Sequence, residues 1–84
     1  MKITLKLFAT LGDYLPEAAR QKNELPLEVA PSTTVAEIIS RFNLPEKLVH
    51  LVLVNGAYVA HDSRLAHELQ EGDVLAIWPP IAGG

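Results

Sequence analysis

The sequence predicts an α+β fold in which a mixed sheet of four or five strands carries one main helix on one face. Three observations support this prediction. Polar and apolar residues alternate at the N-terminus, residues 34–43 have the period of an amphipathic helix, and residues 74–78 form a short apolar stretch typical of a strand. A chain of 84 residues is long enough for one such domain with a single modest core.

Two strands are predicted in the first third of the chain. In residues 2–8 the three odd-numbered positions are apolar, and we expect them to face the core. Residues 9–16 contain turn-forming residues and are predicted to form a loop with a short helix. Alternation returns in residues 24–29, where Pro26 indicates an edge strand because proline cannot donate to a neighbouring strand.

The only segment with a convincing helical pattern begins after Thr34. Thr34 and Glu37 have the spacing of a capping box, in which each residue satisfies a backbone N–H of the other. Asn43 and Pro45 are expected to end the helix. The apolar residues at helical spacing, which we expect to cover the sheet, are Val35, Ile38, Ile39 and Phe42.

The second half of the chain contains three more predicted strands. Residues 49–54 are almost continuously apolar, which indicates an interior strand, and Asn55-Gly56 indicates a turn directly after it. Residues 58–60 are predicted to form a short returning strand. The last strand, at residues 74–78, leads directly into two prolines.

The order of the predicted elements defines the topology. Between the last two strands, Leu65 and Leu69 are spaced to anchor a single helical turn. Strand, strand, helix, strand, short strand, strand, with the C-terminal strand emerging beside the N-terminal one, is the order of a β-grasp fold. We expect residues 1–84 to form a single domain of this kind.

Six residues follow the last strand and are predicted to form an extended tail at residues 79–84. Its two prolines lack a backbone N–H, so strand pairing stops there and the chain leaves the sheet. Its two glycines have no Cβ, so the tail can thread a narrow passage, and a nucleophile can approach the terminal carboxylate unhindered. The alternative is a frayed terminus without function. The tail residues are Pro79, Pro80, Ile81, Ala82, Gly83 and Gly84.

Three aromatic residues are predicted to gather on the sheet face that the helix leaves open. Phe8 and Trp78 fall on the outward side if Ile77 faces the helix, and Tyr58 is a candidate to join them. An exposed aromatic cluster usually marks a protein interface. Two alternatives stay open: a loop such as the segment around Tyr14 covers the aromatics, or a register shift of one residue places them in the core.

Composition excludes several classes of function. The net charge of −3, with scattered lysines and arginines, argues against nucleic acid as a partner. The alternating N-terminus predicts neither a signal peptide nor a membrane span, so a cytoplasmic location is expected. The chain has no cysteine, which excludes disulfides and thiol catalysis. His50, His61 and His67 lack the spacing of a metal pair, and no catalytic constellation is recognisable, so we expect no metal and no catalysis by this chain alone.

Five segments together resemble the MoaD/ThiS family of ubiquitin-like sulfur carriers, and most of all its MoaD branch, the small subunits of molybdopterin synthase. The tail motif is specific, whereas the other segments gain weight from their order along the chain. The segments are residues 3–9, 34–37, 54–56, 71–73 and 79–84.

The resemblance implies a cycle of activation and sulfur delivery. A ubiquitin-activating-like enzyme of the MoeB/ThiF type would consume ATP to adenylate the Gly84 carboxylate, and sulfur would then replace the adenylate as a thiocarboxylate. Gly83 would be the spacer that lets Gly84 thread into the enzyme. The charged tail would enter a MoaE-like large synthase subunit, which transfers the sulfur to the pterin precursor of the molybdenum or tungsten cofactor. The carrier itself would bind no cofactor. The partner-binding residues that the resemblance implies are Phe8, Tyr58, Trp78, Pro79, Pro80, Ile81 and Ala82.

Three other functions stay open from the sequence. The same carrier chemistry could serve thiamine thiazole or another sulfur metabolite. Gly84 could be joined to lysines of target proteins, as in a ubiquitin-like modifier. A passive interaction module would need neither Gly83 nor Gly84.

Overall fold

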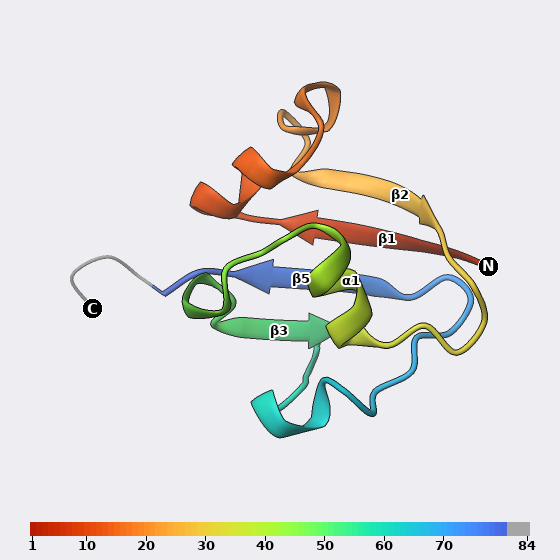
Figure 1. Cartoon of the computed structure of the whole chain (residues 1–84). Coiled ribbons are helices and arrows are strands. Elements are labelled where there is room, and N and C mark those ends of the chain that lie inside the picture. Colours follow the sequence, from red (N-terminus) through yellow and green to blue (C-terminus); the bar gives the residue numbers. More distant parts are fainter. Residues whose placement is uncertain (81–84) are drawn as a thin grey trace.

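A mixed sheet with the strand order β2-β1-β5-β3-β4 is the centre of the molecule, which the computed structural model describes from residue 1 to residue 80 (Figure 1). The strands are β1 (Lys2–Leu7), β2 (Glu24–Glu28), β3 (Leu51–Val54), β4 (Ala57–Tyr58) and β5 (Val74–Trp78). The helices are α1 (Val35–Arg41) and the short 3-10 helices η1 (Ala9–Tyr14), η2 (Glu17–Ala19), η3 (Glu46–Leu48) and η4 (His61–Ser63).

The pairing of β1 with β5 makes the sheet mixed. These two central strands run parallel, whereas β2 pairs with β1, β3 with β5 and β4 with β3 in antiparallel fashion. The last strand therefore lies beside the first, and α1 crosses one face of the sheet (Figure 1). This is the β-grasp arrangement expected from the order of the elements, and the α+β prediction is confirmed.

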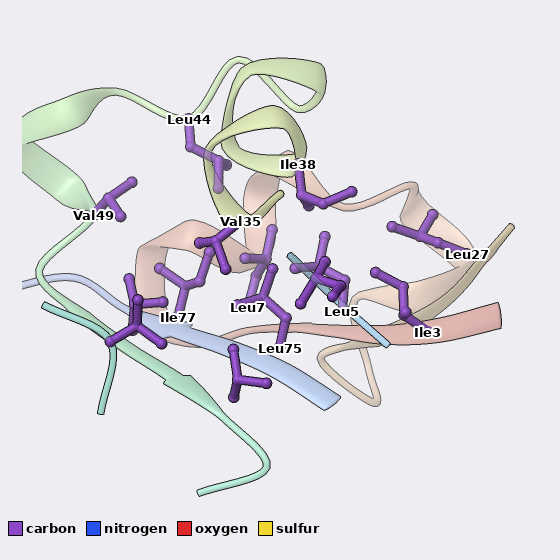
Figure 2. Packing of buried hydrophobic residues seen from close by; sticks show 14 of the residues in the cluster. Ile3, Leu5, Leu7, Leu27, Val35, Ile38, Leu44, Val49, Leu75 and Ile77 are labelled. Atoms are coloured by element: carbon purple, nitrogen blue, oxygen red, sulfur yellow. The ribbon is translucent and has the colours of Figure 1, made fainter. Parts of the chain in front are cut away.

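The core lies between α1 and the sheet. Val35 and Ile38 of α1 point toward the inward residues of β1 and β5 (Figure 2). Leu5 is paired with Leu75, and both side chains are fully buried. Burial of one such side chain contributes about 1.5–3 kcal/mol, so this central layer supplies much of the stability.

A capping box starts α1, as predicted. The Thr34 hydroxyl accepts a hydrogen bond from the Glu37 N–H at 3.2 Å, and the Glu37 carboxylate accepts one from the Thr34 N–H at 3.1 Å. Phe42 caps the other end, and Asn43 adopts a left-handed φ of 54° that stops the helix. Of the four predicted core residues, Val35 and Ile38 are buried, whereas the other two pack against the core only in part.

We expect Thr34→Ala to lower the free energy of unfolding by about 1 kcal/mol, because the Glu37 N–H loses its partner at the start of a helix of only two turns. Urea denaturation followed by the fluorescence of Trp78 measures this. Ser40→Ala, at an exposed position of the same helix, is the matched control and should change the stability by less than about 0.5 kcal/mol. Equal effects of the two substitutions would contradict the capping role.

Both edges of the sheet are short or interrupted. Pro26 lies in the edge strand β2, as predicted, between the exposed Glu28 and the half-buried Glu24. On the other side, β4 has only two residues and follows a tight turn in which Asn55 and Gly56 have φ values of 51° and 83°. Directly before β3, where β4 does not pair, the carbonyls of Val49 and His50 accept hydrogen bonds from the buried Arg64 side chain, each at 3.4 Å.

The segment between η4 and β5 differs from the prediction. Leu69 is buried, but Leu65 is 81% exposed, so the expected helical turn anchored by both leucines is wrong for Leu65. The backbone explains the difference, because the Leu69 N–H donates to the Thr33 carbonyl and fixes Leu69, but not Leu65, against the start of α1. Among residues 1–80, no helix has the length and apolar character needed to cross a membrane.

Candidate functional site

The face of the sheet opposite α1 is arranged in crosswise rows. Strand register places Lys6, Ala76, Leu53 and Tyr58 in one row, which runs across β1, β5, β3 and β4. In the next row, toward the end of β5, Trp78 is paired with Leu51. Phe8 directly follows β1 and takes the third place in that row, because its N–H donates to the carbonyl of Ile77.

These rows divide the open face into an apolar part and a charged part. Over β5, β3 and β4 the outward side chains form what we call the outer apolar face. Over β1 and β2 the corresponding positions include Lys2, Lys6, Glu24 and Glu28, with Lys2 opposite Glu28 and Lys6 opposite Glu24. An apolar partner surface is therefore complementary to the first part and not to the charged one. The outer apolar face consists of Phe8, Leu51, Leu53, Tyr58, Val74, Ala76 and Trp78.

Phe8 and Trp78 are stacked on this face. Their ring centroids are 4.3 Å apart, and the ring planes differ by 7°. Both side chains are half-buried, so no loop covers either ring completely, and the strand register places both on the outer face and not in the core. Tyr58 is 63% exposed on the same face, but it lies on β4 with β3 between it and Trp78. The predicted proximity of Phe8 and Trp78 is confirmed, and Tyr58 joins the face without joining the stack.

The base of the tail lies beside the stack. The last strand bonds of β5 join the Phe8 N–H to the Ile77 carbonyl at 3.2 Å and the His50 N–H to the Trp78 carbonyl at 3.0 Å. Pro79 is half-buried and Pro80 exposed, and neither has an N–H to continue the ladder. The predicted site residues Ile81, Ala82, Gly83 and Gly84 lie outside the described part of the chain, and the roles predicted for them stay predictions.

A sequence model of the ThiS family matches residues 5–84, which is nearly the whole chain and includes the strands that form the outer apolar face. The chain belongs to the ThiS family. The resemblance drawn from the sequence is thereby confirmed.

Curated relatives and solved structures agree with this ThiS-family membership. The molybdopterin synthase sulfur carrier subunit of Drosophila yakuba is 34% identical over 79 residues, which cover 93% of this chain and 87% of the relative. The solution structure of the Haloferax volcanii HVO 2177 protein matches with a TM-score of 0.75 and 26% identity, over 100% of this chain and 87% of that one.

A third comparison concerns an assembly. The complex of subunits 1 and 2 of the molybdopterin-converting factor from Helicobacter pylori contains a chain that matches with a TM-score of 0.61 and 18% identity, over the full length of both chains. At this identity the match shows the shared fold only.

Leu51 and Leu53, which belong to the outer apolar face, were not identified from the sequence. Their neighbours Val52 and Val54 are buried, whereas Leu51 is 36% exposed and Leu53 half-buried. Because residues 51–54 are all apolar, alternation gives no signal for the outward side. Asn55 indicates where the strand turns, but not which side of the strand faces outward.

His50 directly precedes β3, and His61 begins η4. His61 approaches the Glu46 carboxylate at 3.2 Å and the Asp62 carboxylate at 3.4 Å, with all three side chains exposed. Within the described residues 1–80, no group of three or more histidine, cysteine, aspartate or glutamate side chains is placed to hold a metal ion.

Proposed function

We propose that this chain is the sulfur carrier subunit of a molybdopterin synthase. Its membership in the ThiS family and the shared name of its curated relatives support the carrier role. The observation that carries the proposal is that the outer apolar face runs up to Pro79, so that a docked protein would lie next to the start of a tail ending in Gly83-Gly84.

The chemistry that we propose takes place at the carboxylate of Gly84. A carboxylate oxygen attacks the α-phosphorus of ATP, pyrophosphate leaves, and an acyl-adenylate forms. A hydrosulfide-level sulfur then attacks the acyl carbon and AMP leaves, which gives a thiocarboxylate. Activation is needed because a bare carboxylate is a poor electrophile, and docking of the carrier converts the transfer into an effectively intramolecular step.

Two partners follow from this chemistry. A MoeB/ThiF-type adenylating enzyme would bind ATP and charge the tail, so the carrier needs no cofactor of its own. A MoaE-like large subunit would accept the charged tail, and the assembly of two subunits of the Helicobacter pylori molybdopterin-converting factor supports a partner of this kind. Both enzymes would work in the cytoplasm, where ATP is available.

Intact-mass spectrometry tests the proposal. The protein is incubated with the adenylating enzyme of its own organism, ATP and sulfide, and we expect a mass increase equal to the exchange of one oxygen for one sulfur at Gly84. A carrier of the family that gains sulfur under these conditions, treated in parallel, is the positive control. An unchanged mass beside a charged control would contradict the proposal. Capture of a thiazole synthase instead of a MoaE-like subunit would assign the sulfur to another product.

Tyr58→Ala is expected to weaken binding to the large subunit about tenfold, because Tyr58 is the most exposed aromatic residue of the outer apolar face. Isothermal titration with the MoaE-like subunit measures the affinity. Tyr58→Phe, which keeps the ring, should stay within about threefold of the original affinity. A Kd unaffected by Tyr58→Ala would place the interface elsewhere.

A further inference from the structure

The described strand bonds of β5 end at Ile77 and Trp78, directly before the tail. The Trp78 carbonyl accepts the last strand bond on the β3 side, from the N–H of His50, and the Ile77 carbonyl accepts the last one on the β1 side. Pro79 and Pro80 cannot donate to either neighbouring strand. Among the described residues, a further restraint at the end of β5 comes from side chains: the Phe8 ring is stacked on Trp78 on the β1 side, and Leu51 is paired with Trp78 on the β3 side.

Phe8 is itself held firmly on both sides of its Cα. Its N–H donates to Ile77, and its carbonyl accepts from the N–H of Leu11, which is fully buried. Ala9, the next residue, adopts a φ of 52°, a left-handed conformation that is uncommon for alanine. The chain thus makes a strained turn directly after Phe8, and strained residues persist only where their surroundings fix them.

The exposed areas of the outer apolar face separate two roles. Phe8 and Trp78 cover each other with nearly parallel rings, so one face of each ring is inaccessible to a partner. Tyr58 and Leu51, which are 63% and 36% exposed, have larger exposed fractions than the two stacked rings, which are half-buried. The freely exposed side chains of this face therefore lie on β3 and β4, whereas the stack joins the residue after β1 to the end of β5.

We infer that Phe8 is a positioning residue: by stacking on Trp78 it fixes the strand end from which the tail continues, and so aligns the terminal carboxylate for adenylation after docking. This inference rests on the proposed function, in which that carboxylate attacks ATP. Positioning of this kind acts on the rate within the bound complex more than on affinity.

ATP–pyrophosphate exchange by the adenylating enzyme of the same organism, measured against carrier concentration, separates the two roles. We expect Phe8→Leu, which keeps an apolar side chain but no ring, to lower kcat about tenfold with less than about a threefold rise in KM for the carrier. Phe8→Tyr restores the ring and should restore kcat. Tyr58→Ala should do the opposite of Phe8→Leu, with a KM raised about tenfold and kcat within about twofold.

The isolated carrier provides a second readout that needs no enzyme. Trp78 is the only tryptophan, so its emission reports the stack. We expect Phe8→Leu to shift this emission to longer wavelength and to accelerate amide hydrogen exchange at His50, whose N–H is bonded to Trp78. Ser40→Ala, on the other layer of the molecule, should change neither quantity.

Two outcomes would overturn the inference: unchanged Trp78 emission and His50 exchange in Phe8→Leu, or a raised KM with unchanged kcat. Failure of the proposed function looks different, because the original carrier would then support no exchange of pyrophosphate at all. In that case the measurements on the isolated carrier still decide whether Phe8 fixes the end of β5.

Discussion

Removal of Gly83 and Gly84 is expected to abolish thiocarboxylate formation, a fall of at least about a thousandfold, because the carboxylate can no longer reach the nucleotide and alignment in the bound complex is lost. The outer apolar face extends to the residue before Pro79, so the shortened protein keeps the proposed docking surface and loses only the proposed reactive end. Intact-mass spectrometry after incubation with the adenylating enzyme, ATP and sulfide measures the product.

The shortened protein also provides its own control. It should keep the urea midpoint and the Trp78 emission of the full chain, because the core and the stack lie within residues 1–80. It should also compete with the full-length carrier for the adenylating enzyme. A truncated protein that still gains sulfur would show that Gly84 is not the site of activation.

Leu75→Ala is expected to lower the free energy of unfolding by about 3 kcal/mol, because it opens a cavity in the centre of the core. Leu75 is fully buried in β5, opposite Leu5 and below α1 (Figure 2). Domains of this size have a total stability of about 5–15 kcal/mol, so the loss is a large fraction of it. Urea denaturation with linear extrapolation measures the change.

Leu51→Ala is the matched control for this prediction. It removes the same atoms from the neighbouring strand β3, but on the outer apolar face, where the leucine is 36% exposed. We expect a loss of less than about 1 kcal/mol in stability. If the two substitutions cost the same, the division of the sheet into a core face and a docking face is wrong.

The existence of five strands and the start of the helix follow from local rules, and the sequence was sufficient to predict them. The bounds differ most for two strands: those expected at residues 49–54 and 58–60 are Leu51–Val54 and Ala57–Tyr58. Alternation in residues 2–8 reports directly which side of β1 is buried, and the pairing of Thr34 with Glu37 needs only residues of one helical turn. The stack of Phe8 on Trp78 was predictable in part, since it follows once β1 and β5 are placed side by side and the register is correct.

Other features depend on contacts that the sequence does not encode locally. Leu51 and Leu53 belong to a strand that is apolar on both faces, so only its neighbours show which side is open. Leu65 and Leu69 have helical spacing, but a backbone bond from Leu69 to Thr33, distant in sequence, fixes one leucine and leaves the other in solvent. Long-range contacts of this kind override local spacing.

The short or interrupted edges of the sheet limit the ways in which a partner protein can bind. Pro26 in β2, the two-residue β4 and the Arg64 side chain over the carbonyls of Val49 and His50 leave little free main chain along which a foreign strand could be added. Binding would then depend on side-chain contacts. Two proteins held by side-chain contacts can dissociate without breaking a series of main-chain hydrogen bonds. The proposed carrier, charged by one enzyme and discharged at another, would benefit from such rapid release. Short or interrupted edge strands also disfavour strand-by-strand aggregation.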